Sequence, residues 1–319
     1  MPIRYRNRFV LRALGVALLS IVAAGVAMGQ DDVIRIEANL VSVPISVFDR
    51  DGRYVANLSK EDFHIFENGE EQEITYFGTS DEPITVVMLL DRSGSMGLYM
   101  GQMATAASSF VKELRPDDQL TAATFANFAY ELFDVTKVSN LRKGIRIDKC
   151  CPSDNNTFIY DAVQWALNKV KKIRGRRAVI LFTDGDGQGQ YASQKQNFKD
   201  AIESAALIYT VMWDTFGDTP PNPKEQSLKI WREVVAADRA YMVDLARISG
   251  GRAYKIKDIS DLSETFKSVA DELRKQYYLG YYPNKIGKDG EKRKITVKIN
   301  RADIAVRSRN EVVYKKPKN

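Results

Sequence analysis

Two continuous apolar runs, each ending at an aspartate, constrain the fold of this chain most. The first covers residues 84–90 and ends at Asp91, and the second covers residues 178–182 and is followed by Thr183 and Asp184. Strands without polar alternation are typical of a parallel sheet covered by helices on both faces. Segments with helical spacing follow both runs. We therefore expect a doubly wound, Rossmann-like α/β domain with a mostly parallel sheet.

The other elements of this domain are predicted from apolar spacing and from the turn residues between segments. We expect helices over residues 96–114, 157–173, 193–206, 225–248 and 261–276, and further strands over residues 119–125, 128–133, 207–212 and 252–256. Strand and helix alternate throughout, which predicts one α/β domain over residues 83–276.

The two flanks show the shorter alternation of antiparallel strands. Residues 30–80 contain turn signals at Gly52 and at Asn68-Gly69, and residues 277–319 carry further alternating segments. Neither flank is comfortably long enough to form a stable sheet alone. We expect the C-terminal flank to join the N-terminal sheet in a small β domain, with the α/β domain inserted into it. The aromatic run at residues 277–282 is either a binding face or sheet packing, and its β preference favours packing.

The first 29 residues have the parts of a secretory signal peptide. Arginines precede an apolar run over residues 13–28, and Ala27-Met28-Gly29 is a small-x-small cleavage pattern. We expect residues 1–29 to be removed and the protein to be exported to the periplasm, the cell envelope or the medium. The apolar run is only slightly short for a membrane span, so an uncleaved anchor is the alternative.

The basic composition comes mostly from this leader. The formal net charge is +6, and leaving out the four arginines before residue 30, where no acid occurs, brings it to +2. Nucleic-acid binding is therefore not indicated. The basic residues between Lys169 and Arg177 are interpreted as a solvated helix end.

Catalytic and redox residues are sparse. The two cysteines, Cys150 and Cys151, are adjacent, so they form no disulfide framework and are interpreted as free or vicinally bridged thiols. The one histidine, His64, lies in the N-terminal flank. Residues 94–97 miss the spacing of a nucleophile elbow, and the sequence contains no P-loop. An enzyme is therefore not expected.

Oxygen side chains gather where the apolar runs end. Asp91, Ser93 and Ser95 alternate in one tight loop, Thr157 opens a predicted helix, and Asp184 follows the second run. Ligands of doubly wound sheets bind beyond the carboxyl ends of the strands. A hard cation such as Mg²⁺ requires about six oxygen ligands. Single serines at such turns also serve as helix caps, but capping does not account for Thr157 and Asp184.

Three segments resemble the von Willebrand factor A and integrin I-domain family: residues 91–96, 156–163 and 182–185. The resemblance covers about residues 83–275. It implies a metal-ion-dependent adhesion site with direct ligands Ser93, Ser95 and often Thr157. Asp91 and Asp184 would act directly or through water. The flanks resemble exported proteins related to this family that are common in acidobacteria-like genomes.

The resemblance implies a function in binding. A divalent cation, Mg²⁺ or alternatively Mn²⁺ or Ca²⁺, would coordinate an aspartate or glutamate of a protein partner. The expected role is adhesion or interaction, without catalysis and without nucleic acid. Two alternatives stay open: a structural envelope module with a non-functional metal site, and a magnesium-dependent hydrolase.

Overall fold

The computed structural model describes residues 40–79, 82–141, 144–147, 156–185, 188–213 and 225–314, with the side chains of residues 225–232 left aside. The chain divides into two compact units, and all of these residues lie in the second, Ala38–Asn319. The predicted signal peptide and the cysteine pair Cys150-Cys151 lie outside the described residues. None of the helices in the described ranges is both long and apolar enough to cross a membrane.

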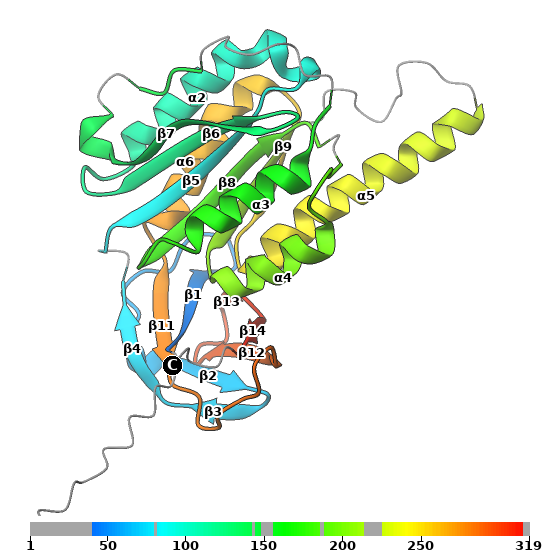
Figure 1. The fold of residues 1–319 in the computed structure, drawn as a ribbon. Coiled ribbons are helices and arrows are strands. Elements are labelled where there is room, and N and C mark those ends of the chain that lie inside the picture. The colour runs from blue at the N-terminus through cyan, green and yellow to red at the C-terminus, as the bar shows by residue number, and fades with distance from the viewer. Residues whose placement is uncertain are drawn as a thin grey trace, which may run out of the picture. The chain divides into compact units, whose positions relative to one another are not determined.

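A six-stranded sheet forms the centre of the α/β part (Figure 1). Its order is β10 (Ala253–Ile256), β9 (Leu207–Trp213), β8 (Arg176–Thr183), β5 (Ile84–Asp91), β6 (Gln119–Phe125) and β7 (Ala129–Lys137). All neighbours pair in parallel except β6 and β7. The predicted doubly wound, mostly parallel sheet is confirmed, with one antiparallel strand at its edge.

Helices cover both faces of this sheet. One face packs on α2 (Met100–Glu113) and α6 (Leu262–Leu273), and the other on α3 (Ile159–Val170), α4 (Gln194–Ser204) and α5 (Glu225–Ser249). Every residue of β5 is buried, and its side chains alternate between the two apolar clusters. Each fully buried large apolar side chain contributes about 1.5–3 kcal/mol. Burial on both faces explains why β5 reads as an unbroken apolar run.

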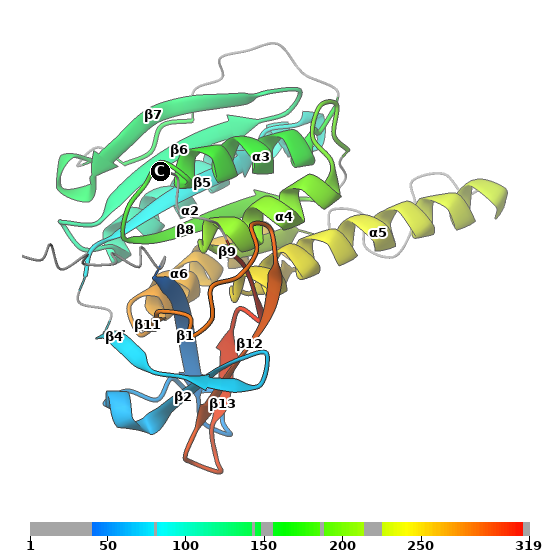
Figure 2. The ribbon, with the colours of Figure 1, turned by 60° about the horizontal axis from the view of Figure 1, so that its bottom comes forward.

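The two flanks build antiparallel sheets together (Figure 2). The N-terminal flank supplies β1 (Val41–Phe48), β2 (Phe63–Glu67), β3 (Glu70–Gln72) and β4 (Ile74–Gly78), and the C-terminal flank supplies β11 (Tyr277–Tyr281), β12 (Lys292–Ile299), β13 (Ala305–Ser308) and β14 (Glu311–Val313). The strand orders are β13-β1-β11-β4 and β14-β12-β2-β3. Each sheet mixes strands of both flanks, as the fold-class prediction required. The exact domain boundaries stay a prediction.

Short 3₁₀ helices complete the described elements. They are η1 (Lys60–Asp62), η2 (Gly94–Tyr99), η3 (Val138–Asn140) and η4 (Ile259–Asp261). The helix predicted over residues 96–114 therefore begins as η2 and becomes an α-helix only at Met100. The helix predicted from Thr157 begins at Ile159, so Thr157 lies in the preceding loop.

The interpretation of the basic cluster as a solvated helix end was wrong at its last two members. Arg176 and Arg177 open β8. Arg176 is buried, donates to the carbonyl oxygens of Glu82 and Leu273, and lies over the ring of Tyr278. Arg177 donates through Nη2 to the carbonyl oxygen of Ser204 at 2.7 Å. These arginines satisfy backbone carbonyls where the sheet meets the flanks.

The aromatic run packs in a sheet, as its β preference predicted. All five residues of β11 are buried, and Tyr277, Leu279 and Tyr281 belong to the core between the flank sheets. Tyr282, just beyond the strand, is exposed. The alternative that Tyr277–Tyr281 forms a binding face is therefore wrong.

Candidate metal centre

The end of β5 holds the aspartate of the first predicted loop. Asp91 is the last residue of the strand and is fully buried. Its Oδ1 accepts the backbone N–H of Ser93 at 2.8 Å, and its Oδ2 accepts the hydroxyl of Thr183 at 2.5 Å. The N–H of Arg92 donates to the carbonyl oxygen of Phe125, at the end of β6. The turn is thereby fixed to the carboxyl ends of both neighbouring strands.

The two serines of this loop converge. The hydroxyl oxygens of Ser93 and Ser95 lie 3.1 Å apart. Ser93 is buried and Ser95 is exposed, while Met96 is buried in the core and anchors the 3₁₀ turn between sheet and helix. The Met96 N–H donates to the carbonyl oxygen of Ser93 at 2.9 Å. The loop therefore presents two hydroxyls side by side at the edge of the sheet.

The end of β8 lies beside the end of β5, because the two strands pair in parallel. Thr183 is the last residue of β8. Its hydroxyl donates a hydrogen bond to Asp91, and its Oγ1 accepts one from the N–H of Gly185 at 3.1 Å. Gly185 has φ +84°, a left-handed conformation that favours glycine. Asp184 is half-buried between them.

The two aspartates affect each other electrostatically. Burial, followed by the negative charge of Asp184, raises the pKa of Asp91 to about 7, although hydrogen bonds from Thr183 and Ser93 act in the opposite direction. Desolvation and a neighbouring like charge both disfavour the ionised carboxylate. Two carboxylates are thus held close together at the carboxyl edge of the sheet.

Backbone contacts bring Thr157 to the same edge. The N–H of Phe158 donates to the carbonyl oxygen of Ala126, directly after β6, at 2.9 Å. The carbonyl oxygen of Thr157 accepts the N–H of Gln188 at 2.9 Å, and the carbonyl oxygen of Gln188 accepts the N–H of Tyr160 at 3.3 Å. The Thr157 loop is therefore connected to the end of β6 and to the segment after β8.

Asp161 fixes this last segment to α3. Its carboxylate accepts three backbone N–H groups, from Gln190 at 2.6 Å, Tyr191 at 3.0 Å and Ala192 at 2.6 Å. Hydrogen bonds to an ionised acceptor are stronger than neutral ones. The segment that follows Asp184 is thus held against the helix that follows Thr157.

All five predicted site residues lie at one edge of the sheet. Asp91, Ser93 and Ser95 are connected by hydrogen bonds, Asp184 acts electrostatically on Asp91, and Thr157 is placed there by its backbone. Their role as metal ligands stays a prediction.

Sequence reasoning missed two positioning residues. Thr183 orients the Asp91 carboxylate, and Asp161 holds the segment after β8. The signal for Thr183 was its place at the end of an apolar run, next to an acid. The signal for Asp161 was its place in the first turn of a helix that follows a candidate ligand.

The donor set fits a hard cation. It consists of two carboxylates and three hydroxyls, all oxygen, without sulfur or nitrogen. Within the described ranges, no three His, Cys, Asp or Glu side chains gather into a metal-binding group. A site with only two acids needs its hydroxyls, and the 3.1 Å approach of Ser93 and Ser95 supplies two of them.

Comparison with known proteins agrees with this architecture. Residues 86–187 match the family model of the von Willebrand factor type A domain. This stretch runs from β5 through β8 and contains all five candidate ligands. The α/β part thus has a von Willebrand factor A-like fold, with the flanks adding antiparallel sheets. No curated protein matches the chain in sequence.

Similar solved structures come from animals and bacteria. One is proximal thread matrix protein 1 of the mussel byssus, with 15% identity, a TM-score of 0.46 and coverages of 61% of this chain and 49% of that one. This chain therefore spans about half the length of the mussel protein. Another is a von Willebrand factor type A protein from Catenulispora acidiphila, with 10% identity, TM-score 0.46 and coverages of 88% and 76%. A third is the vWF domain of the pilus tip protein Mfa5 from Porphyromonas gingivalis, with 12% identity, TM-score 0.44 and coverages of 59% and 94%.

Proposed function

We propose that this protein binds another protein through a divalent cation held at the carboxyl edge of its von Willebrand factor A-like sheet. Ser93, Ser95 and Thr157 would be direct ligands, and Asp91 and Asp184 would bind directly or through water. The observation that carries the proposal is the convergence of the Ser93 and Ser95 hydroxyls, 3.1 Å apart, beside the buried Asp91 carboxylate.

Mg²⁺ is the proposed cation, with Mn²⁺ or Ca²⁺ as substitutes. Hydroxyl and carboxylate oxygens are hard ligands, which suit these ions. The cation would supply Lewis acidity toward an anionic oxygen of the partner. The chain's own contribution is positional. Thr183 holds the Asp91 carboxylate, Met96 anchors the serine loop, and Asp161 holds the segment after β8.

The proposed partner is a protein that presents an aspartate or glutamate, and the surroundings of the site support protein binding. Three large apolar side chains are exposed on the loops at this edge: Leu98 in η2, Phe128 in the β6–β7 turn and Tyr191 in the segment after β8. Leu98 is 88% exposed and Tyr191 is 79% exposed. Exposed apolar groups beside a polar centre are typical of protein interfaces.

The proposal assigns no catalytic step. The histidine His64 lies on β2 of the flank sheets, where its ring nitrogens contact Glu71 at 2.6 Å and Asn300 at 2.8 Å. A hydrolase would require a general base beside the cation. With the proposed export, the site would act in the periplasm, at the cell envelope or outside the cell, in adhesion or in assembly of envelope proteins.

Calorimetric titration of the purified chain with Mg²⁺ and with Mn²⁺ tests the metal site. We expect saturable binding that is abolished in an Asp91→Ala, Ser93→Ala double variant and weakened at least about tenfold in Ser95→Ala. Ser95 is exposed, so its truncation leaves the core intact.

Ser139→Ala is the matched control for removal of one hydroxyl. Ser139 is exposed and follows β7, beside the amino end of β6 and therefore at the opposite edge of the sheet. It should bind the cation like the unmodified protein. Absence of binding by the well-folded unmodified protein would refute the metal site and favour the structural envelope module.

A further inference from the structure

A cavity lies away from the metal centre, between the amino end of the α/β sheet and the flank strands. It has a volume of about 290 Å³. Its lining comes from the start of β1, the end of α4, the start of β8 and the C-terminal strand β14. Three arginines line it, namely Arg177, Arg293 and Arg309. Three guanidinium groups in one small cavity concentrate positive charge there.

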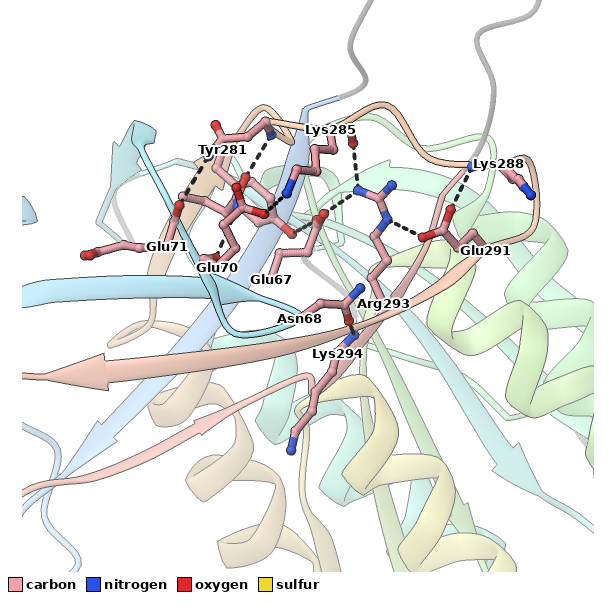
Figure 3. A network of polar contacts seen from close by, with 12 residues as sticks. Glu67, Asn68, Glu70, Glu71, Tyr281, Lys285, Lys288, Glu291, Arg293 and Lys294 are labelled. Atoms are coloured by element: carbon pink, nitrogen blue, oxygen red, sulfur yellow. Dashed lines mark hydrogen bonds and ion pairs between the residues drawn. The ribbon is translucent and has the colours of Figure 1, made fainter.

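Arg293 has negative charge beside it within the protein (Figure 3). It forms an ion pair with Glu67, and its Nε donates to Glu291 at 3.0 Å. The second carboxylate oxygen of Glu67 accepts the hydroxyl of Tyr281 at 2.6 Å. Arg293 and Glu67 are each about nine-tenths or more buried, so they neutralise each other in the interior.

Arg309 lacks such a partner among the described residues. It follows β13, is 3% exposed, and its Nη1 donates only to the carbonyl oxygen of Ile202 at 3.4 Å. Its Nε is buried with no hydrogen-bond partner in the part of the chain that the structure describes. A guanidinium stays protonated, so a positive charge is buried here without a carboxylate beside it. An unpaired buried charge costs free energy that a bound anion would offset.

The other charged groups of the lining do not fill this role. Arg177 gives its donors to backbone carbonyls, including that of Ser204 at 2.7 Å. Besides Glu67, the lining contains the acid Glu203, whose Oε1 lies 3.9 Å from the ammonium of Lys199. Burial, together with the positive charge of Arg177, lowers the pKa of Arg309 to about 10, although Tyr281 acts in the opposite direction. The surroundings of Arg309 are therefore short of negative charge.

We propose that this cavity binds a compact oxyanion, held by the guanidinium of Arg309 and attracted by Arg177. The planar donor fork of arginine matches phosphate and carboxylate oxygens. A volume of about 290 Å³ admits an orthophosphate ion or a small dicarboxylate. The site is separate from the metal centre and does not depend on the proposed function.

Titration of the divalent-free full chain with orthophosphate or with malonate tests the site, with chloride at equal ionic strength as the reference. We expect saturable binding of one or both oxyanions. At a concentration 100 times Kd, the ligand should lower the unfolding equilibrium constant about 100-fold. Phosphate binding alone identifies a phosphate site, and malonate binding alone identifies a carboxylate site. Absence of both from the folded protein overturns the proposal.

Arg309→Met separates a binding site from a merely buried charge. The variant should be as stable as the unmodified protein or more stable without oxyanion, because a buried charge is replaced by an apolar side chain of similar length. Its oxyanion affinity should fall at least about tenfold. Unchanged affinity contradicts the proposal. If the variant does not fold, Arg309→Lys, which keeps the charge but loses the fork, should still bind more weakly; equal affinity contradicts the proposal in the same way.

Two further variants serve as controls. Arg301→Met removes one exposed positive charge from the preceding connection, between β12 and β13, so it should leave oxyanion binding unchanged. The Asp91→Ala, Ser93→Ala double variant should keep oxyanion binding while it loses cation binding. The two sites can thus fail independently.

Discussion

The position of the segment after β8, beside the metal centre, depends on the carboxylate of Asp161. It accepts three consecutive backbone N–H groups, and its oxygens are the acceptors that hold Gln190, Tyr191 and Ala192. The same segment, through Gln188, contacts the backbone of Thr157. A change at Asp161 should therefore reach a candidate ligand that its side chain does not touch.

We predict that Asp161→Asn loosens this segment without unfolding the protein. The amide has one carbonyl acceptor in place of two charged oxygens, so the hydrogen bonds weaken and stability falls by about 1–3 kcal/mol. Hydrogen exchange of residues 190–192 should accelerate at least about tenfold, and cation affinity should fall. Asp244→Asn, at a half-exposed acid of α5 paired with Arg247, is the control. Exchange rates equal to those of the control would contradict the assigned role.

Residue types and spacing were enough to predict which side chains gather at the sheet edge. Asp91 and Asp184 end apolar runs, and parallel strands bring such ends together. The hydrogen bond from Thr183 to Asp91 was not predictable, because it depends on the register of β5 against β8. The buried charge of Arg309 was hidden for a similar reason, since its surroundings come from strands and helices far apart in the sequence.

At the scale of elements, α3 and α4 are joined by a buried acid. Asp200 on α4 is about 5% exposed, and its Oδ2 accepts Lys171 at 2.8 Å and Gln164 at 2.6 Å. Burial alone would raise the pKa of Asp200, but the hydrogen bonds from Lys171, Gln164 and Gln196 outweigh it and the pKa is lowered. The ionised form is therefore favoured in the folded state.

We predict a pH-dependent loss of this contact. Because the pKa is lower in the folded state, its stabilisation is complete above the unfolded pKa of about 4 and is lost as the pH falls through the folded value. Urea unfolding should show Asp200→Asn less stable than the unmodified protein by about 1–2 kcal/mol at pH 7, with a smaller difference at pH 3. Asp117→Asn, at an exposed acid, should show no such change. A difference that is constant with pH would refute the interpretation.

Elements were predictable where one physical pattern dominated. The buried strands β5, β8 and β9 agree with their apolar runs within two residues at either end. The start of α2 was not predictable from the sequence. Gly94 to Tyr99 form a 3₁₀ turn whose shape follows from the serine loop and the burial of Met96. Arg176 and Arg177 were interpreted as part of a solvated cluster. Their hydrogen-bond acceptors are backbone carbonyls, which cannot be recognised from residue types in the sequence.

At the scale of the whole molecule, one buried acid connects the α/β sheet to the flank strands. Glu272 on α6 is fully buried, and its Oε1 accepts Tyr209 of β9 at 2.8 Å and Ser46 of β1 at 3.3 Å. The same oxygen pairs with Arg307 of β13. Three strands from both parts therefore meet at one carboxylate.

We predict that Glu272→Leu destabilises the protein by about 3–5 kcal/mol, because it leaves Arg307 partly buried without its carboxylate. The double variant Glu272→Leu, Arg307→Met should recover part of this loss, since both charges are then replaced by apolar groups. Denaturant unfolding measures both. Glu264→Leu, on an exposed position of the same helix, is the control. A double variant that loses the sum of the two single effects would argue against direct coupling.

The pairing of β4 with β11 has a mechanical consequence. The chain leaves the flank sheet at Gly78 and returns at Tyr277, and the register places Gly78 opposite Tyr278. Tension applied between residues 40 and 314 would therefore pass through the ladders of the flank sheets. The backbone of the α/β domain would not be extended until the β4–β11 ladder separates. A partner pulling on this protein through its flanks would stretch them first, while the candidate metal centre keeps its shape.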